Sequence, residues 1–224
     1  MTIVLTNDDG IDAPGIRALQ KAVGESIIVA PKHHLSGCGH QVTTAQPIEV
    51  QTRSAREYAV DGTPADCTRL AVTQLCDRVK WVLSGINAGG NLGVDVYISG
   101  TVAAVREAAM HSVPGIAISH WIKRPLLLDW EVATKRAAKV LAELYSRPLP
   151  PGSFWNVNLP HLEPEAAEPK IVFCEPSTQP LPVDYRVEGN RYQYQGEYAN
   201  RKRQTGTDVD VCFSGNIAVT LIRL

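Results

Sequence analysis

The chain has 224 residues, 44% of them hydrophobic, with 22 basic and 23 acidic side chains and a formal net charge of -1. These values fit a globular protein with one large domain, and no sustained basic stretch indicates a nucleic-acid polymer as partner. No apolar run approaches the roughly 20 residues that span a bilayer, and Asp8 and Asp9 interrupt the region where a signal peptide is apolar. We therefore expect a cytoplasmic protein without a membrane partner.

The first two thirds of the chain alternate short apolar runs with helical periodicity. This succession is typical of a doubly wound α/β core with a mostly parallel sheet. Strands are expected at 3–5, 27–30, 48–52, 58–60, 81–83, 115–119 and 155–159. Helices are expected at 14–23, 64–76, 101–111 and 130–145, and long loops at 31–45 and 84–100.

The C-terminal part has a different character. Residues 147–184 are rich in proline, residues 191–198 alternate aromatic and polar side chains, and residues 216–222 are typical of a last strand. The alternation predicts an exposed β-hairpin within an excursion from the core at about 180–203. We expect residues 1–224 to form one domain and this excursion to pack on another subunit.

The side chains that hold soft metals do not cluster along the chain. No Cys-x-x-Cys pair occurs and the number of cysteines is odd, so neither a zinc site nor a disulfide framework is indicated. We expect the histidines to be surface or packing residues, with His33 and His34 as exceptions because they lie in the long polar loop at 31–45. The cysteines are Cys38, Cys67, Cys76, Cys174 and Cys212, and the other histidines are His40, His111, His120 and His161.

Two adjacent carboxylates follow the first predicted strand. The apolar run at 3–5 leads directly to Asp8 and Asp9, and Gly10 ends the segment. In an open α/β sheet, ligands bind at this end of the strands. Because adjacent anions repel each other, a hard divalent cation explains the pair most simply, although two aspartates before a glycine are on their own typical of a turn.

Two further loops bring neutral oxygen donors to the same edge of the predicted sheet. Ser36 follows the strand at 27–30, and Asn87 follows the strand at 81–83. Together with the two aspartates, these side chains would form an all-oxygen shell that favours magnesium, manganese or calcium over zinc or copper. Taken singly, serine and asparagine are ordinary loop residues.

A third segment introduces anion chemistry. Ser99, Gly100 and Thr101 open the helix expected at 101–111. Backbone N–H groups at a helix N-terminus bind anions, and the two hydroxyl groups could add donors. The alternative is an ordinary serine or threonine N-cap. A divalent cation beside such a helix start would make a site for a phosphate ester.

In combination, these motifs resemble the SurE family of stationary-phase survival proteins, which are metal-dependent 5'/3'-nucleotidases. The run from Thr6 to Ile16 is similar to the N-terminal signature of that family. Further similar segments, in family order, are Ala30-Pro31 followed by Ser36-Gly37, Gly62 to Cys67, Ser84 to Gly89, Asn91 to Gly93, Ser99 to Ala104, Asn156 to Asn158 and Gly206 to Asp208.

The resemblance implies one divalent cation, magnesium or manganese, held by Asp8, Asp9, Ser36 and Asn87. It also implies a Rossmann-like fold, hydrolysis of nucleoside monophosphates as a 5'-nucleotidase, and homodimers or homotetramers in which C-terminal parts exchange between subunits.

The favoured function is therefore metal-dependent hydrolysis of nucleoside 5'- and 3'-monophosphates, with Asp8 and Asp9 as catalytic residues that could also orient the attacking water. Two alternatives remain open. Phosphatases that form an aspartyl-phosphate usually carry Asp-x-Asp after the first strand, whereas this chain has Gly10 at the third position. A non-catalytic nucleotide-binding or sensing protein is the other alternative. The residues expected to bind the phosphate are Asn91, Ser99, Gly100 and Thr101.

Overall fold

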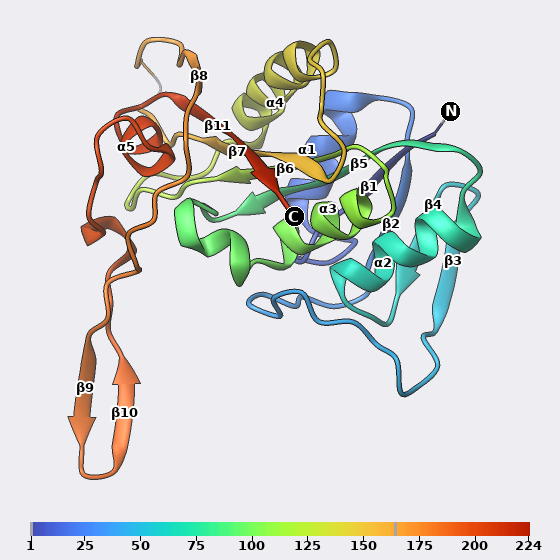
Figure 1. Ribbon diagram of the computed structural model, residues 1–224, viewed down its shortest axis with the longest axis horizontal. Helices are drawn as coiled ribbons and strands as arrows, with labels where there is room; N and C mark the ends of the chain where they lie inside the picture. Colours follow the sequence, from blue (N-terminus) through green and yellow to red (C-terminus); the bar gives the residue numbers. More distant parts are fainter. Residues whose placement is uncertain (1, 164) are drawn as a thin grey trace.

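The computed structural model describes residues 2–163 and 165–224. Over these residues a nine-stranded sheet lies between two layers of helices, and a separate two-stranded hairpin extends from the body (Figure 1). The strands are β1 (Thr2–Thr6), β2 (Ile27–Pro31), β3 (Val50–Ser54), β4 (Glu57–Val60), β5 (Val79–Ala88), β6 (Gly115–His120), β7 (Ser153–Leu159), β8 (Ile171–Phe173), β9 (Tyr185–Glu188), β10 (Arg191–Tyr194) and β11 (Ile217–Arg223). The helices are α1 (Pro14–Val23), α2 (Pro64–Leu70), α3 (Gly100–Met110), α4 (Trp130–Leu144) and α5 (Asp208–Phe213), with short helical turns η1 (Ala71–Leu75), η2 (Gly93–Tyr97) and η3 (Tyr198–Asn200).

The order of the strands determines where a ligand can bind. The sheet runs β3-β4-β2-β1-β5-β6-β7-β11-β8, and the strands from β4 to β7 are parallel to one another. After β1 the chain builds outward on one side through β2, and it later returns to place β5 on the other side of β1. The crevice beyond the carboxyl ends of β1 and β5 is thus the topological switch point, where open α/β sheets bind ligands.

Alternating strand residues face two separate cores. On β1, Leu5 belongs to a core with α1 and α4, while Val4 belongs to a core with α2 and α3. Both side chains are fully buried, as expected for central parallel strands covered on both faces. The predicted doubly wound, mostly parallel fold is confirmed, and the two helix layers hold the loops at the switch point in place.

Local signals explain where the helices begin. Thr63 caps α2, and its side chain and that of Asp66 form a reciprocal capping box. Ser99 caps α3 by accepting a hydrogen bond from the Val102 N–H. The helix predicted at 64–76 is regular only to Leu70 and continues as the wider turn η1.

The predicted C-terminal hairpin is present within the expected excursion at about 180–203. The alternating segment supplies its second strand, β10, which pairs with β9. A Gly189-Asn190 turn joins the two strands. Tyr198 lies beyond the hairpin in η3, where it is half-buried.

Three other elements depart from the predictions. Strand β5 continues to Ala88, into the segment expected to be a glycine-rich loop, because its last residues pair with β6. Strand β8 and helix α5 lie in segments for which no element was predicted. Across the described part of the chain, no helix combines the length and apolar character needed to cross a membrane.

Candidate active site

A pocket of about 260 Å³ lies at the switch point and brings together most of the residues selected from the sequence. Asp8, Ser36, Asn87, Asn91 and Ser99 all line it. They come from the ends of β1 and β5, the loops after β2 and β5, and the start of α3. The lining is completed by Gly37, Gly90, Asp95, Ile98, Leu181 and Tyr198.

Asp8 is a deeply buried carboxylate of this pocket, with 4% of its surface exposed. The Thr101 hydroxyl donates a hydrogen bond of 2.5 Å to Asp8 Oδ1. Burial raises the pKa of Asp8, the Thr101 hydrogen bond opposes that rise, and the neighbouring Asp9 adds to it. An ideal Cβ at Gly100 would lie 2.9 Å from Asp8 Cβ, so only glycine lets α3 approach this closely.

Asp9 does not line the pocket, but it lies at its edge between two loops. The Ala88 N–H donates to Asp9 Oδ2 at 3.3 Å, and His34 Nδ1 lies 3.3 Å from Asp9 Oδ1. The first contact joins the end of β1 to the end of β5. The second places His34, from the loop at 31–45, beside Asp9.

Backbone hydrogen bonds hold the loop that carries Ser36. The Leu35 N–H donates to the Asp8 carbonyl at 2.7 Å, and the Gly39 N–H donates to the Ile98 carbonyl at 3.2 Å. These bonds lie on both sides of Ser36, whose side chain is exposed. The loop is therefore tied to both segments that it faces.

The side chain of Asn87 is held by its amide nitrogen. Its Nδ2 donates to the Gly89 carbonyl at 2.8 Å, so its Oδ1 is the atom that could accept or coordinate. Among the described residues no group of three or more His, Cys, Asp or Glu side chains could hold a metal ion. Two carboxylates with amide and hydroxyl oxygens are a donor set that suits a hard cation.

The start of α3 offers donors for an anion. Because Ser99 caps the Val102 N–H, the Gly100 N–H is left as a donor at the open end of the helix. Thr101 is fully buried, and both its hydroxyl and its backbone N–H act on the Asp8 carboxylate. Thr101 therefore orients Asp8, and neither Gly100 nor Thr101 lines the pocket itself.

Asn91 is held by a buried polar network. Its Nδ2 donates to Ser119 Oγ at 2.8 Å, and its backbone N–H donates to Asn158 Oδ1 at 2.8 Å. Its carbonyl accepts hydrogen bonds from the side chains of both Asn156 and Asn158. These contacts fix the backbone of Asn91 where its side chain reaches the pocket.

The sequence interpretation missed a buried ion pair next to the pocket. Arg201 donates to Asp95 Oδ2 at 2.6 Å, and neither side chain is more than 5% exposed. The Tyr198 hydroxyl donates to the same oxygen at 2.6 Å. The burial of Arg201 is set by tertiary contacts that no local pattern signals. These contacts attach the base of the excursion to η2.

A second network ties the Ser36 loop to the middle of α3. Glu107, buried in α3, accepts from Arg69 Nε at 2.6 Å and contacts His40 Nε2 at 2.7 Å and His111 Nε2 at 3.2 Å. Burial alone would raise the pKa of Glu107, but the hydrogen bonds from His40 and Arg69 outweigh it and lower the pKa to about 2. His40 is thus a hydrogen-bond partner of Glu107 as well as a packing residue.

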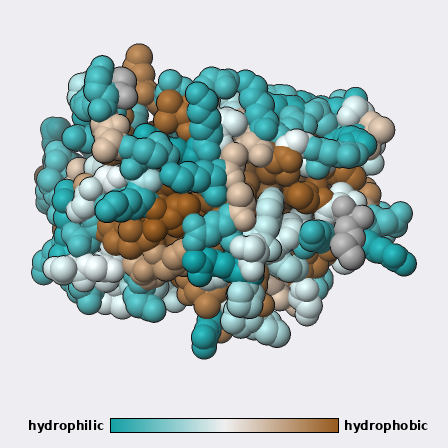
Figure 2. All heavy atoms as spheres, turned by 90° about the horizontal axis from the view of Figure 1, so that it is seen from above, coloured by the Kyte–Doolittle hydropathy of each residue, from teal (hydrophilic) through white to brown (hydrophobic). Residues whose placement is uncertain are grey.

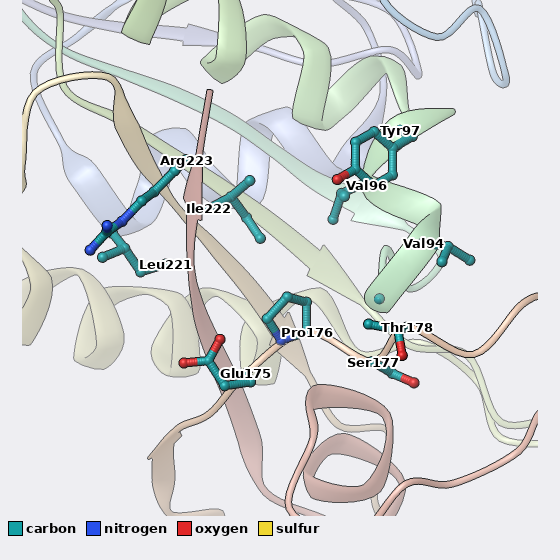
Figure 3. A pocket seen from close by; sticks show the side chains of 11 residues that line it. Val94, Val96, Tyr97, Glu175, Pro176, Ser177, Thr178, Leu221, Ile222 and Arg223 are labelled. Carbon is teal, nitrogen blue, oxygen red and sulfur yellow. The ribbon is translucent and has the colours of Figure 1, made fainter.

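A different cavity, of about 440 Å³, lies between η2, residues 175–178 and the end of β11 (Figure 3). Its ionisable side chains are Tyr97, Glu175 and Arg223. None of the residues selected from the sequence lines it, so the smaller pocket at the switch point is the candidate active site.

Comparisons with known proteins show what the chain as a whole is similar to. The family model described as "Survival protein SurE" matches residues 3–180. A protein of Nostoc sp. is 64% identical over 226 residues and is covered completely, as is this chain. The 5'-nucleotidase SurE of Caulobacter vibrioides is 35% identical, with 100% of this chain and 90% of that protein covered. The crystal structure of the SurE protein from Aquifex aeolicus superimposes with a TM-score of 0.86 at 31% identity, over 100% of this chain and 93% of that one.

Proposed function

Because the chain belongs to the SurE family, we propose that it is a 5'-nucleotidase, which hydrolyses nucleoside 5'-monophosphates to a nucleoside and phosphate. The observation that carries this proposal is the single pocket in which Asp8, Asn87 and Ser99 meet at the switch point. Oxygen ligands for a cation and the N-terminus of α3 lie together there, and a phosphate ester needs both.

The proposal includes one divalent cation per subunit, magnesium or manganese, with Asp8, Asp9, Ser36 and Asn87 as its ligands. The orientation of the Asn87 amide and the closeness of the two carboxylates support this set. A cation bound there supplies Lewis-acid chemistry at a phosphoryl oxygen.

The protein's own groups then bind and orient the reactants. The Thr101 hydroxyl holds Asp8 in position, while Ser99, Asn91 and the Gly100 N–H at the start of α3 bind the phosphate. Asp8 and Asp9 orient the water that attacks phosphorus. The ester P–O bond breaks, and the leaving alkoxide takes a proton from solvent. All of these groups serve the phosphate, so we extend the proposal to nucleoside 3'-monophosphates.

The proposal extends to the domain organisation, the assembly and the compartment of the protein. Residues 1–224 form one domain, whose excursion at about 180–203 joins subunits into a homodimer or homotetramer. The five cysteines are free thiols, which supports a reducing compartment such as the cytoplasm.

The test is phosphate release from a panel of 5'- and 3'-nucleotides by metal-stripped protein, without metal and with magnesium or manganese. We expect no turnover in the presence of EDTA and recovery on adding either ion in excess. Full activity in the chelated sample would contradict the metal requirement.

The same samples separate the alternatives. Nucleotide binding without phosphate release would identify a non-catalytic nucleotide-binding protein. A phosphorylated aspartate found by mass spectrometry during turnover would indicate the aspartyl-phosphate route instead of direct attack by water.

A further inference from the structure

A second cavity, of about 890 Å³, adjoins the active-site pocket. The two share Gly90 and Tyr198 in their linings. An ideal Cβ at Gly90 would lie 3.0 Å from the Tyr198 hydroxyl oxygen, so glycine keeps the boundary between the cavities free of a side chain. We name the larger space the adjoining cavity. It is lined by Ala88 to Gly90 after β5, Trp121 to Arg124 after β6, and Gly196 to Ala199 at the base of the excursion.

The walls of the adjoining cavity are fixed by contacts outside it. The Trp121 ring stacks on Phe213 with centroids 4.2 Å apart. Tyr198 donates its hydroxyl to Asp95, and the buried Arg201–Asp95 ion pair holds the adjacent chain. A cavity whose walls are held in this way is largely formed before a ligand arrives.

The charges on its lining are open to a ligand. Lys123 and Arg124 are exposed, and within the described part of the chain neither forms an ion pair. Glu197 is the one acidic residue on the lining, and its Oε2 accepts a hydrogen bond from Asn200 at 2.8 Å. One carboxylate, two cations and the backbone of three glycines form a polar surface beside the candidate phosphate site.

We propose that the adjoining cavity binds the nucleoside of the substrate while its phosphate lies in the active-site pocket, an inference that rests on the proposed function. The phosphate ester links the two parts of a nucleotide, and the shared boundary at Gly90 and Tyr198 links the two cavities. Glu197 accepts hydrogen bonds from the vicinal hydroxyl groups of the ribose, the pairing that carboxylates make with this group in nucleotide sites. The Arg124 guanidinium lies over a face of the base.

The inference predicts a specific change in selectivity. The comparison uses AMP, dAMP and phenyl phosphate as substrates of the full-length, metal-loaded protein. In Glu197→Gln and Arg124→Ala, we expect the ratio of kcat/KM for AMP to that for phenyl phosphate to fall about tenfold, a loss typical of one charge-assisted contact. The preference for AMP over dAMP should fall in Glu197→Gln and persist in Arg124→Ala, because dAMP lacks the 2'-hydroxyl.

Two variants on the exposed face of α4, Glu131→Gln and Lys135→Ala, are matched controls and should leave both ratios unchanged. Turnover of both AMP and phenyl phosphate with ratios unaffected by the cavity variants would overturn this inference and leave the proposed function standing. Failure of the wild-type protein to release phosphate from any of the three substrates would overturn both.

Discussion

Asp8 carries its negative charge in a place from which water is almost excluded. Its one side-chain donor is Thr101, and a second carboxylate follows directly in the chain. Burial raises the pKa of Asp8. In the metal-free protein at neutral pH, the ionised Asp8 side chain therefore lowers the free energy of unfolding. The residue is thus poorly placed for stability and well placed to bind a cation, a conflict that is typical of functional sites.

Asp8→Asn should separate these two roles. We expect phosphatase activity to fall on the order of 100-fold, while the free energy of unfolding of the metal-free protein rises by about 1 kcal/mol at pH 7. Because the folded-state pKa is the raised one, the gain should shrink as the pH falls through that raised pKa and should be absent below about 4, where Asp8 is protonated in both states. Urea unfolding of EDTA-treated wild type and Asp8→Asn, at pH 7 and at a pH below about 4, measures the difference in their free energies of unfolding.

Asp9→Asn should lose activity to a similar degree, with a smaller gain in stability because its carboxylate is less buried. Asp12→Asn is the control, since Asp12 is exposed and pairs with Arg53 on the surface. If Asp8→Asn or Asp9→Asn kept wild-type turnover at limiting metal, that residue would not be a ligand.

Among the site residues, the sequence allowed prediction of those whose signals lie close together in the chain. Asp8 and Asp9 are adjacent, and Ser99 lies directly before a helix, so strand and capping signals were enough to select them. The side-chain role of Thr101 could not be predicted, because its hydroxyl meets Asp8 only after α3 packs against β1. The same holds for Asp95 and Arg201, which are far apart in the chain.

At the scale of elements, α3 is the part on which the site depends most. Its N-terminus lies at the pocket, and Glu107, two turns later, binds His40 from the Ser36 loop and Arg69 from α2. One buried carboxylate therefore sets the relative position of three segments. The Ser36 loop gains a side-chain anchor in addition to its backbone bonds.

Glu107→Gln tests this anchor. The lowered pKa of about 2 means that ionised Glu107 stabilises the fold above its ordinary value of 4.5, and that this contribution is lost as the pH falls toward 2. We expect a loss of about 2 kcal/mol at pH 7 that disappears near pH 2, measured by urea unfolding. The KM for AMP should rise as the loop loosens.

Glu131→Gln serves as the control, because Glu131 pairs with Lys21 on the surface. Equal stability of Glu107→Gln and wild type at pH 7 would show that the network contributes nothing to the fold.

The central elements were predictable because their periodicity and caps agree with their tertiary environment. The hairpin was predicted at the right place because the alternation at 191–198 indicates a strand, although that alternation does not identify the partner strand. The Gly189-Asn190 dipeptide, which is a turn signal, indicates that β9 precedes it. The end of β5 and all of β8 depend on pairing with distant strands, which local patterns do not report.

At the scale of the whole molecule, the hairpin projects from the body (Figure 1). Cross-strand pairing places Tyr185 opposite Tyr194 and Val187 opposite Tyr192, so all four lie on the same face. Each is about half exposed or more. The face of the molecule in Figure 2 also shows hydrophobic areas among hydrophilic ones. An isolated two-stranded hairpin is marginally stable, and exposed aromatic faces typically mark interaction surfaces.

Deleting the hairpin should therefore reduce the size of the particle. Asp184 and Gln195 are already hydrogen-bonded at 2.8 Å, so Gly-Gly can replace Tyr185 to Tyr194 without moving the base. Light scattering should show a smaller species than the wild type, with metal binding retained.

The variant Val187→Lys with Tyr192→Glu keeps the hairpin but charges its apolar face, and it should give the same reduction. Wild-type protein that is monomeric at high micromolar concentration would contradict an oligomeric role for this face.

The position of β11 has a consequence for synthesis. This strand is the last in chain order, yet it lies between β7 and β8, antiparallel to the first and parallel to the second. On the ribosome, Asp8, Asn87 and α3 emerge long before it, while β7 keeps an unpaired edge and β8 has no strand to join. The long segment between β7 and β11 must wait beside that open edge. The interval before Ile217 to Arg223 leaves the exit tunnel is thus when the nascent chain is most exposed to wrong pairing and most in need of a chaperone.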